Sequence, residues 1–378
     1  MNSLKRIIQK NISNIPGWTT KRRIVVIESD DWGSIRLFSK ESRDKMKAFG
    51  LNVEAIHYDS VDSLESNKDL EILFDFLSQF KDKNGRNPVF TAFCNTGNPD
   101  FEKIINSNYE QYFFQPLEAT LRDYPEHDKV LHLWKKGVQE GYFVPEIHGR
   151  EHVNVRRFIK ILQSHEGKEG LRYAAALKSL GASAFNNIQY PNYLGALHPE
   201  SADEIAELHK HLLESGELFK NYVGYYPRAF IAPNAEEPKE LEKSLHHIGV
   251  NYLTRSKKRI YPKGDGVFEK EWNFIGGKNE FGQIVINRNC FFEPVCWGEQ
   301  EHVTNWIDYC LEDIGNAFFW NKPAVICSHR VNYVGFIEPN NREKGLKSLG
   351  LLIKNILSKW PDVEFMSTAE LGDVIRTI

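Results

Sequence analysis

The stretch Ile24-Val25-Val26-Ile27-Glu28-Ser29-Asp30-Asp31-Trp32-Gly33 is an apolar run that stops at two adjacent carboxylates. A short, continuous run of this kind is typical of a strand that is buried on both faces of a parallel sheet. Residues 144–152 repeat the pattern and end on two histidines, and residues 324–330 repeat it with His329 near the end. Because the carboxyl ends of parallel strands meet at one edge of a sheet, these polar ends predict one shared pocket.

Similar apolar runs, rich in β-branched and aromatic residues, recur along the whole chain. We expect strands at 23–29, 88–94, 142–147, 182–187, 227–232, 250–254, 284–290, 323–328 and 363–366. Between most of them lie stretches with helical spacing, such as Leu70, Leu73, Phe74 and Leu77. A strand–helix alternation repeated roughly seven or eight times favours a (β/α) barrel, with an open doubly wound sheet as the alternative.

No linker rich in Gly, Ser or Pro and no internal repeat divides the chain. We therefore expect one domain over 23–378, preceded by a helical extension over 1–22. Insertions near 99–126, 166–200 and 255–283 interrupt the strand–helix rhythm and are expected to lie over the mouth of the barrel. The last of them is rich in glycine, which indicates hairpins.

The bulk composition is that of an ordinary globular protein. The 378 residues are 41% hydrophobic and 26% charged, and the formal charge of -3 gives no reason to expect nucleic acid or an anionic membrane as partner. Aromatic residues make up 12%, which suits a carbohydrate-binding groove as well as a packed core. No window reaches the roughly 18 apolar residues of a membrane span. The five cysteines form no CxxC pair and are expected to be reduced core thiols. The N-terminus lacks a leader-like apolar stretch, so we expect a cytoplasmic protein.

His148 and His152 lie four residues apart just after a predicted strand. If a helix begins near Arg150, both imidazoles lie on one face and can bind one metal ion. The alternative is a coincidental surface pair, because this spacing is common. Asp30 and Asp31 could equally cap a turn, but the apolar strand before them favours a pocket. Adjacent residues at a strand end diverge, so the two carboxylates can take different roles.

One aspartate and two histidines form a set that leaves coordination positions open for water and substrate. Such a set suits zinc, and also cobalt, nickel, manganese or iron(II). A metal lowers the pKa of water toward about 7, and a nearby carboxylate can complete its deprotonation. A histidine on the other side of the metal can then protonate the leaving group. These parts fit hydrolysis of an amide or an ester.

The order of these motifs resembles that of the polysaccharide deacetylases with a NodB-homology domain (carbohydrate esterase family four). The similarity runs from about residue 23 to residue 375 and includes 88–93 as the second strand and 363–371 as the closing strand and helix. The resemblance implies a distorted (β/α)7 barrel with inserted loops over its mouth. It also implies one divalent metal ion, usually zinc, bound by Asp31, His148 and His152.

The catalytic roles follow from the same resemblance. Asp30 matches the general base, and His329 matches the general acid that protonates the leaving amine. Arg228 matches the arginine that orients the base. The backbone N–H of Asn234, just after Pro233, lies where the family has its oxyanion donor.

The chain also departs from the family pattern. Glu28 and Ser29 replace the usual Thr-Phe before the aspartate pair, and Asn234 replaces a tyrosine. The family's Asp-x-x-Asp-Trp motif, which tunes the acid histidine, is not found. Arg288 and Glu293 form a polar cluster that could substitute for it, and we expect them to bind substrate. Trp32 is expected either to stack on a sugar ring or to wall the pocket.

The sequence thus predicts a metal-dependent hydrolase that removes acetyl groups from N-acetylated, or less favourably O-acetylated, sugars or polysaccharide. Two other classes stay open. One is a non-catalytic carbohydrate-binding protein on the same fold. The other is a different metal-dependent hydrolase, such as a glycoside hydrolase or a cyclic amidase, whose sign would be a second carboxylate across the pocket, at Glu28 or Glu293.

Overall fold

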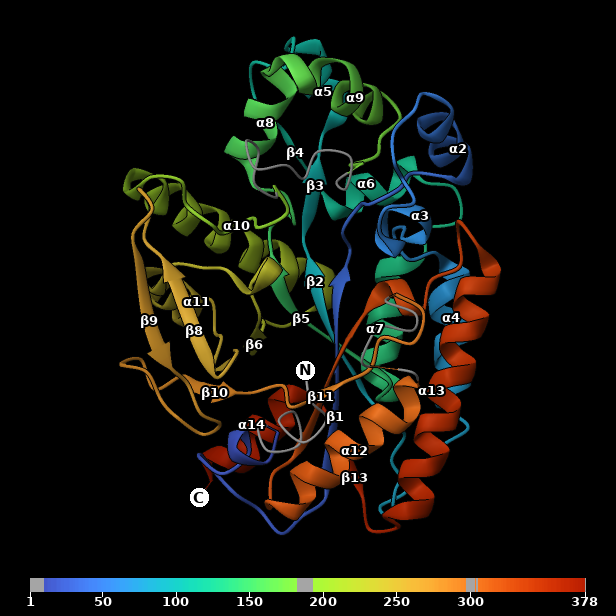
Figure 1. Cartoon of the computed structure of the whole chain (residues 1–378), viewed down its shortest axis with the longest axis vertical. Helices are drawn as coiled ribbons and strands as arrows, with labels where there is room; N and C mark the ends of the chain where they lie inside the picture. Colours follow the sequence, from blue (N-terminus) through green and yellow to red (C-terminus); the bar gives the residue numbers. More distant parts are fainter. Residues whose placement is uncertain (1–9, 182–192, 297–302, 304, 378) are drawn as a thin grey trace.

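A parallel sheet forms the centre of the computed structural model, which describes residues 10–181, 193–296, 303 and 305–377 (Figure 1). Its strands are β1 (Ile24–Trp32), β2 (Phe90–Asn95), β5 (Phe143–Gly149), β6 (Ala229–Phe230), β7 (Tyr252–Thr254), β10 (Ile284–Ile286), β11 (Cys290–Phe291), β12 (Ala324–His329) and β13 (Glu364–Met366). Every residue of β1 is buried, as its unbroken apolar run predicts. The expected strand at 182–187 lies outside the described residues.

The sheet closes on itself through one stretch of chain. The pairing order is β10-β7-β6-β5-β2-β1-β12-β11, and all of these pairs are parallel. Only residues 287–289 separate β10 from β11, so the segment 284–291 pairs first with β7 and then with β12. Within the described chain the barrel therefore has seven strand positions, which are β1, β2, β5, β6, β7, the pair β10–β11 and β12. This confirms the distorted (β/α)7 barrel. The distortion lies between β10, which pairs with β7, and β11, which pairs with β12. β13 is an additional strand that pairs with the first residues of β1.

Helices cover the outside of the barrel. They are α2 (Lys40–Ala48), α3 (His57–Val61), α4 (Asn67–Leu77), α5 (Phe101–Asn106), α6 (Leu117–Asp123), α7 (Val130–Glu140), α8 (Val155–Gln163), α9 (His165–Ala176), α10 (Ile205–Val223), α11 (Glu242–His247), α12 (Trp306–Phe319), α13 (Pro339–Lys359) and α14 (Thr368–Arg376). In α4, Ser66 and Asp69 form a capping box, and the apolar stripe of Leu70, Leu73 and Leu77 is buried. Figure 1 shows α4, α7, α12 and α13 together on one side of the sheet.

The insertions contain small elements of their own. Residues 99–126 contain α5 and α6, and the short strands β3 (Gly97–Pro99) and β4 (Phe114–Pro116) pair there antiparallel. Residues 255–283 contain the antiparallel hairpin of β8 (Lys258–Pro262) and β9 (Phe268–Trp272), which confirms the expected hairpin. At the N-terminal end of the described chain, residues 10–13 are helical. All five cysteines are buried and free, as expected. None of the helices in the described ranges combines the length and apolar character of a membrane-spanning segment.

Candidate active site

The end of β1 separates its two carboxylates. The register of β1 against β2 shifts between Ser29 and Trp32, which marks a bulge, and Asp31 has a left-handed backbone with φ of 75°. Gly33 follows with φ of 74°, and a Cβ atom there would lie 2.5 Å from the carbonyl oxygen of Asn95. This local kink turns Asp30 and Asp31 toward different partners, as the sequence predicted for adjacent residues.

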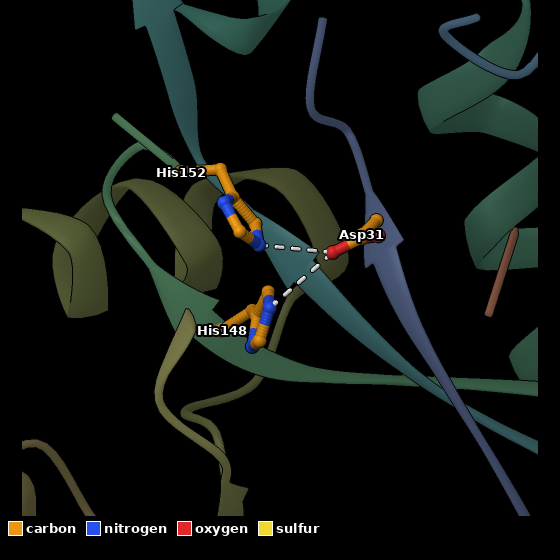
Figure 2. A group of neighbouring side chains, drawn as sticks. All are labelled: Asp31, His148 and His152. Atoms are coloured by element: carbon orange, nitrogen blue, oxygen red, sulfur yellow. Dashed lines mark ion pairs between the residues drawn. The ribbon is translucent and has the colours of Figure 1, made fainter. Parts of the chain in front are cut away.

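Asp31 lies between two imidazoles (Figure 2). Its Oδ1 atom is 3.6 Å from Nε2 of His148 and 3.0 Å from Nε2 of His152. One ligand atom from each residue lies within 4.8 Å of the other two. Burial alone would raise the pKa of Asp31, but the two histidines outweigh it and hold this pKa well below its usual value. The carboxylate is therefore ionised.

The donor atoms of this group fit a divalent metal ion. Nδ1 of His148 lies 2.8 Å from the carbonyl oxygen of Ile231, which can only accept, so Nδ1 carries the proton. The lone pair of His148 then resides on Nε2, which faces Asp31. Two imidazole nitrogens and a carboxylate oxygen form a ligand set that leaves positions open for water.

The helix expected to carry both histidines is not found. His148 lies near the end of β5, Gly149 follows with φ of 125°, and α8 begins only at Val155. Asn154 caps that helix, since its side chain accepts from the N–H of Arg157 at 3.1 Å. The pair therefore converges from a strand end and the loop after it, and the prediction of a helical pair is wrong.

Asp30 is held by Arg288, from the connection between β10 and β11. Nη1 and Nη2 of Arg288 donate to the two oxygens of Asp30 at 2.7 and 2.5 Å, and Nε donates to Glu28 at 2.6 Å. Glu28 also accepts from the hydroxyls of Thr254 and Thr368 at 2.9 and 2.7 Å. Burial would raise the pKa of Asp30, but the charge and hydrogen bonds of Arg288 outweigh it and lower this pKa.

His329 lies beside Asp30, because the two residues are register partners across β1 and β12. Its Nε2 atom is 3.8 Å from Oδ2 of Asp30, and its Nδ1 bonds to Glu293 at 2.6 Å. The side-chain amide of Asn332 donates to the other oxygen of Glu293 at 2.6 Å. Burial lowers the pKa of His329, but Glu293 and the aspartates outweigh it and raise this pKa to about 9. His329 is therefore a cation at neutral pH.

Two predicted roles differ in the structure. Arg228 precedes β6, at the end of the strand opposite to the pocket, and bonds to Asp373 at 2.5 Å. The arginine that orients Asp30 is Arg288, so the role predicted for Arg228 is wrong. Arg288, which was expected to bind substrate, holds Asp30 instead. Glu293 likewise supports His329 together with Asn332 and does not line the cavity.

Trp32 belongs to the core. It is 1% exposed, its ring packs edge-on against Phe143 with centroids 4.9 Å apart, and its indole N–H donates to Ser29 at 3.0 Å. The prediction that Trp32 stacks on a sugar or walls the pocket is therefore wrong.

A cavity of about 330 Å³ lies at the carboxyl ends of the strands. Asp30, Asp31, His148, His152, Arg288, His329 and Asn234 line it; the rest of its wall is Arg36, Ile56, Tyr58, Leu194, Ile231, Ala232 and Ala235. Asn234 has a left-handed backbone with φ of 54°. Sequence reasoning thus predicted most of the charged residues that line the cavity, but not Arg36, Tyr58 or the apolar residues of its wall.

Glu28, Asn332, Arg36 and Tyr58 are the residues that sequence reasoning missed or misjudged. Glu28 carried a signal, since a glutamate two residues before Asp30 in an apolar strand points to the same face. The others lie in loops and short helices, where no periodicity marks a side chain that faces a pocket.

Fold and site together define a class: a seven-stranded (β/α) barrel with a group of two histidines and one carboxylate at its mouth. No family model and no curated protein matches the chain. Solved structures with a similar fold include a protein of Pseudomonas aeruginosa PAO1 assigned as a probable polysaccharide deacetylase (10% identity, TM-score 0.47, 93% of this chain and 91% of that one). A protein from Mycobacterium smegmatis with the same assignment is similar (13%, 0.44, 96% and 93%), and so is PuuE allantoinase (11%, 0.44, 95% and 93%). Proteins of the kind that the motifs resemble are thus among these neighbours, but likeness at this level identifies no activity.

Proposed function

We propose that this protein is a metal-dependent hydrolase that removes acetyl groups from N-acetylated sugars. One observation carries the proposal: a metal-ligand set, an arginine-held carboxylate and a glutamate-held histidine face one cavity. Each of the three parts has a separate task in amide hydrolysis. Asp30 and His329 each have their own hydrogen-bond partner, Arg288 and Glu293. A coincidental cluster of polar side chains would not be expected to have separate partners of this kind.

A divalent ion held by Asp31, His148 and His152, which we propose is zinc, would supply Lewis acidity that acidifies water and polarises a carbonyl oxygen. Asp30 takes the proton of the attacking water. Arg288 keeps Asp30 ionised and fixes both of its oxygens, so the carboxylate presents a lone pair in one direction. This pairing explains why a buried base stays charged.

His329 is the proton donor to the leaving nitrogen. Its Nδ1–H is fixed on Glu293, so Nε2–H is the proton that faces Asp30 and the cavity. An amine leaves far more readily once it is protonated, and a histidine that remains cationic at neutral pH can supply that proton. The main chain at Asn234, on the cavity wall, is our candidate for the N–H that receives the developing oxyanion.

The position of the carboxylates supports deacetylation over cleavage of a glycosidic bond. A glycosidase needs two carboxyls roughly 5–9.5 Å apart across that bond. Among the described residues, the carboxylates that line the cavity are the neighbours Asp30 and Asp31. Glu28 and Glu293 are both engaged by hydrogen bonds behind the lining.

Acetate release over a substrate panel tests the proposal. The panel contains an N-acetylated hexosamine, an N-acetylated oligosaccharide, an O-acetylated xylan fragment and a cyclic amide, each with zinc-loaded protein. We expect acetate from the N-acetylated sugars, at a rate above that from the O-acetylated fragment. Sugar binding with no acetate release would favour a binding protein, and ring opening of the cyclic amide alone would favour a cyclic amidase.

A further inference from the structure

Arg36, in the loop after β1, has an unsatisfied donor at the wall of the active cavity. The residue is 7% exposed and lines the cavity. Its Nη1 atom is buried and has no hydrogen-bond partner within the part of the chain that the structure describes. A buried charged donor without an acceptor is costly, so such a group indicates that an acceptor is supplied from outside the chain.

The protein's own carboxylates leave Arg36 incompletely paired. Its ion pair with Asp62 is long, with Nε 3.9 Å from Oδ2, and the charges of Asp59 and Asp31 also act on the guanidinium. Asp62 already accepts two hydrogen bonds from Arg330, at 3.3 and 3.0 Å. The carboxylates at the cavity floor are also engaged, Asp30 by Arg288 and Asp31 by the two histidines. The guanidinium therefore keeps a donor without a hydrogen-bond partner in a residue that lines the cavity, which a ligand can enter.

Arg36 and the acid His329 both contact the ring of Tyr58. The guanidinium carbon of Arg36 is 5.4 Å from the centroid of this ring, and the His329 ring meets the same ring edge-on at 5.8 Å between centroids. In the proposed reaction His329 protonates the leaving nitrogen, which carries the sugar. A group bound by Arg36 therefore belongs to the sugar and not to the acetyl group.

A guanidinium presents a planar fork of N–H donors, and its best partners are carboxylate and phosphate oxygens. We propose that Arg36 binds an anionic group on the sugar, so that the substrate is an acidic N-acetylated sugar, bearing a carboxylate or a phosphate. This inference rests on the proposed deacetylase function and adds the class of substrate to it.

The test compares three N-acetylated hexosamines on the zinc-loaded protein. N-acetylglucosamine is neutral, N-acetylmuramic acid carries a carboxylate, and N-acetylglucosamine 6-phosphate carries a phosphate. We expect kcat/KM for one of the charged sugars to exceed that for the neutral one by about 10- to 100-fold, as a charge-assisted hydrogen bond predicts. The preferred sugar tells carboxylate from phosphate. A neutral sugar processed as well as both charged ones would overturn the inference and leave the proposed function intact.

Arg36→Gln should reduce kcat/KM for the preferred charged sugar by about 10-fold more than for N-acetylglucosamine, mainly through KM. Arg86→Gln is the matched control, because Arg86 precedes β2 at the opposite end of the barrel and pairs with Glu370. An equal loss on neutral and charged sugars in Arg36→Gln would assign Arg36 a structural role and overturn the inference. If no sugar yields acetate, or the variant does not fold, calorimetric binding of the same sugars to the wild-type chain decides: tighter binding of a charged sugar supports the inference, and equal binding refutes it.

Discussion

Replacing Glu293 by glutamine should change the pH dependence of the reaction more than its maximal rate. Glutamine keeps an oxygen that can accept from Nδ1 of His329, so the ring stays in place, but it removes the charge. In the wild-type protein burial lowers the pKa of His329, and Glu293 with the aspartates raises it to about 9. Without that charge we expect this pKa to fall to about 6.5 or below, the ordinary value for histidine.

The sign and size follow from the proton that His329 must carry. The protonated acid is present below its pKa and is lost as pH rises through it. At pH 8 roughly nine tenths of the wild-type acid is protonated, against about 3% in the variant, so kcat/KM should fall about 30-fold. At pH 6 both forms are mostly protonated, and the loss should be less than about twofold.

The assay is acetate release from an N-acetylated sugar between pH 5.5 and 9.5, for both proteins. The ratio of the two kcat/KM values is used, because titrations common to both proteins cancel in it. An aryl acetate ester serves as a second substrate, since its phenolate leaves without a proton and the variant should hydrolyse it almost normally. A ratio that stays constant with pH, or an equal loss on the ester, would refute the role given to Glu293.

Three further perturbations separate the parts of the account. Arg288→Gln should reduce kcat by at least about 100-fold, because Asp30 loses its buried partner, whereas Arg228→Gln should stay within about twofold; equal effects in acetate release would contradict this. Burial raises the pKa of Glu146 to about 8, so the folded carboxyl keeps its proton where the unfolded one has lost it, and the free energy of unfolding should fall by a few kcal/mol as the pH rises from about 4.5 to 8. Urea unfolding at pH 5 and 9 should show a fall that is larger in the wild type than in Glu146→Gln by a few kcal/mol, and the same fall in both would refute it. Trp32→Ala should cost about 3–5 kcal/mol of unfolding free energy as a core truncation, while Trp32→Phe leaves KM unchanged; a raised KM in a fully stable Trp32→Phe protein would restore the sugar-stacking role.

Periodicity and strand ends favoured a barrel over an open sheet, and the resemblance to the deacetylases implied its seven-stranded, distorted form. The strand expected at 284–290 appears as β10 and β11, split at the point where the barrel closes. The split arises because β10 pairs with β7 and β11 pairs with β12, and the local sequence pattern does not predict these pairings. The grouping of Asp31 with His148 and His152 was predictable for the opposite reason, because the apolar runs before Asp31 and His148 end at the same edge of the sheet.

The supporting residues were harder to predict because their contacts are distant in sequence. Arg288 reaches Asp30 from 258 positions away, and nothing around either residue specifies this pairing. The resemblance pointed to Arg228, yet Arg228 precedes β6 and the pocket lies at the other end of that strand. The helix expected at Arg150 fails because Gly149 and the cap at Asn154 delay its start.

The most direct test of the central claim is metal content measured together with acetate release in Asp30→Asn, with His148→Ala measured alongside. We predict that Asp30→Asn retains one divalent ion per chain and loses at least about a thousandfold in kcat, while His148→Ala loses both metal and turnover. Metal-replete Asp30→Asn protein that releases acetate at a near wild-type rate would contradict the account.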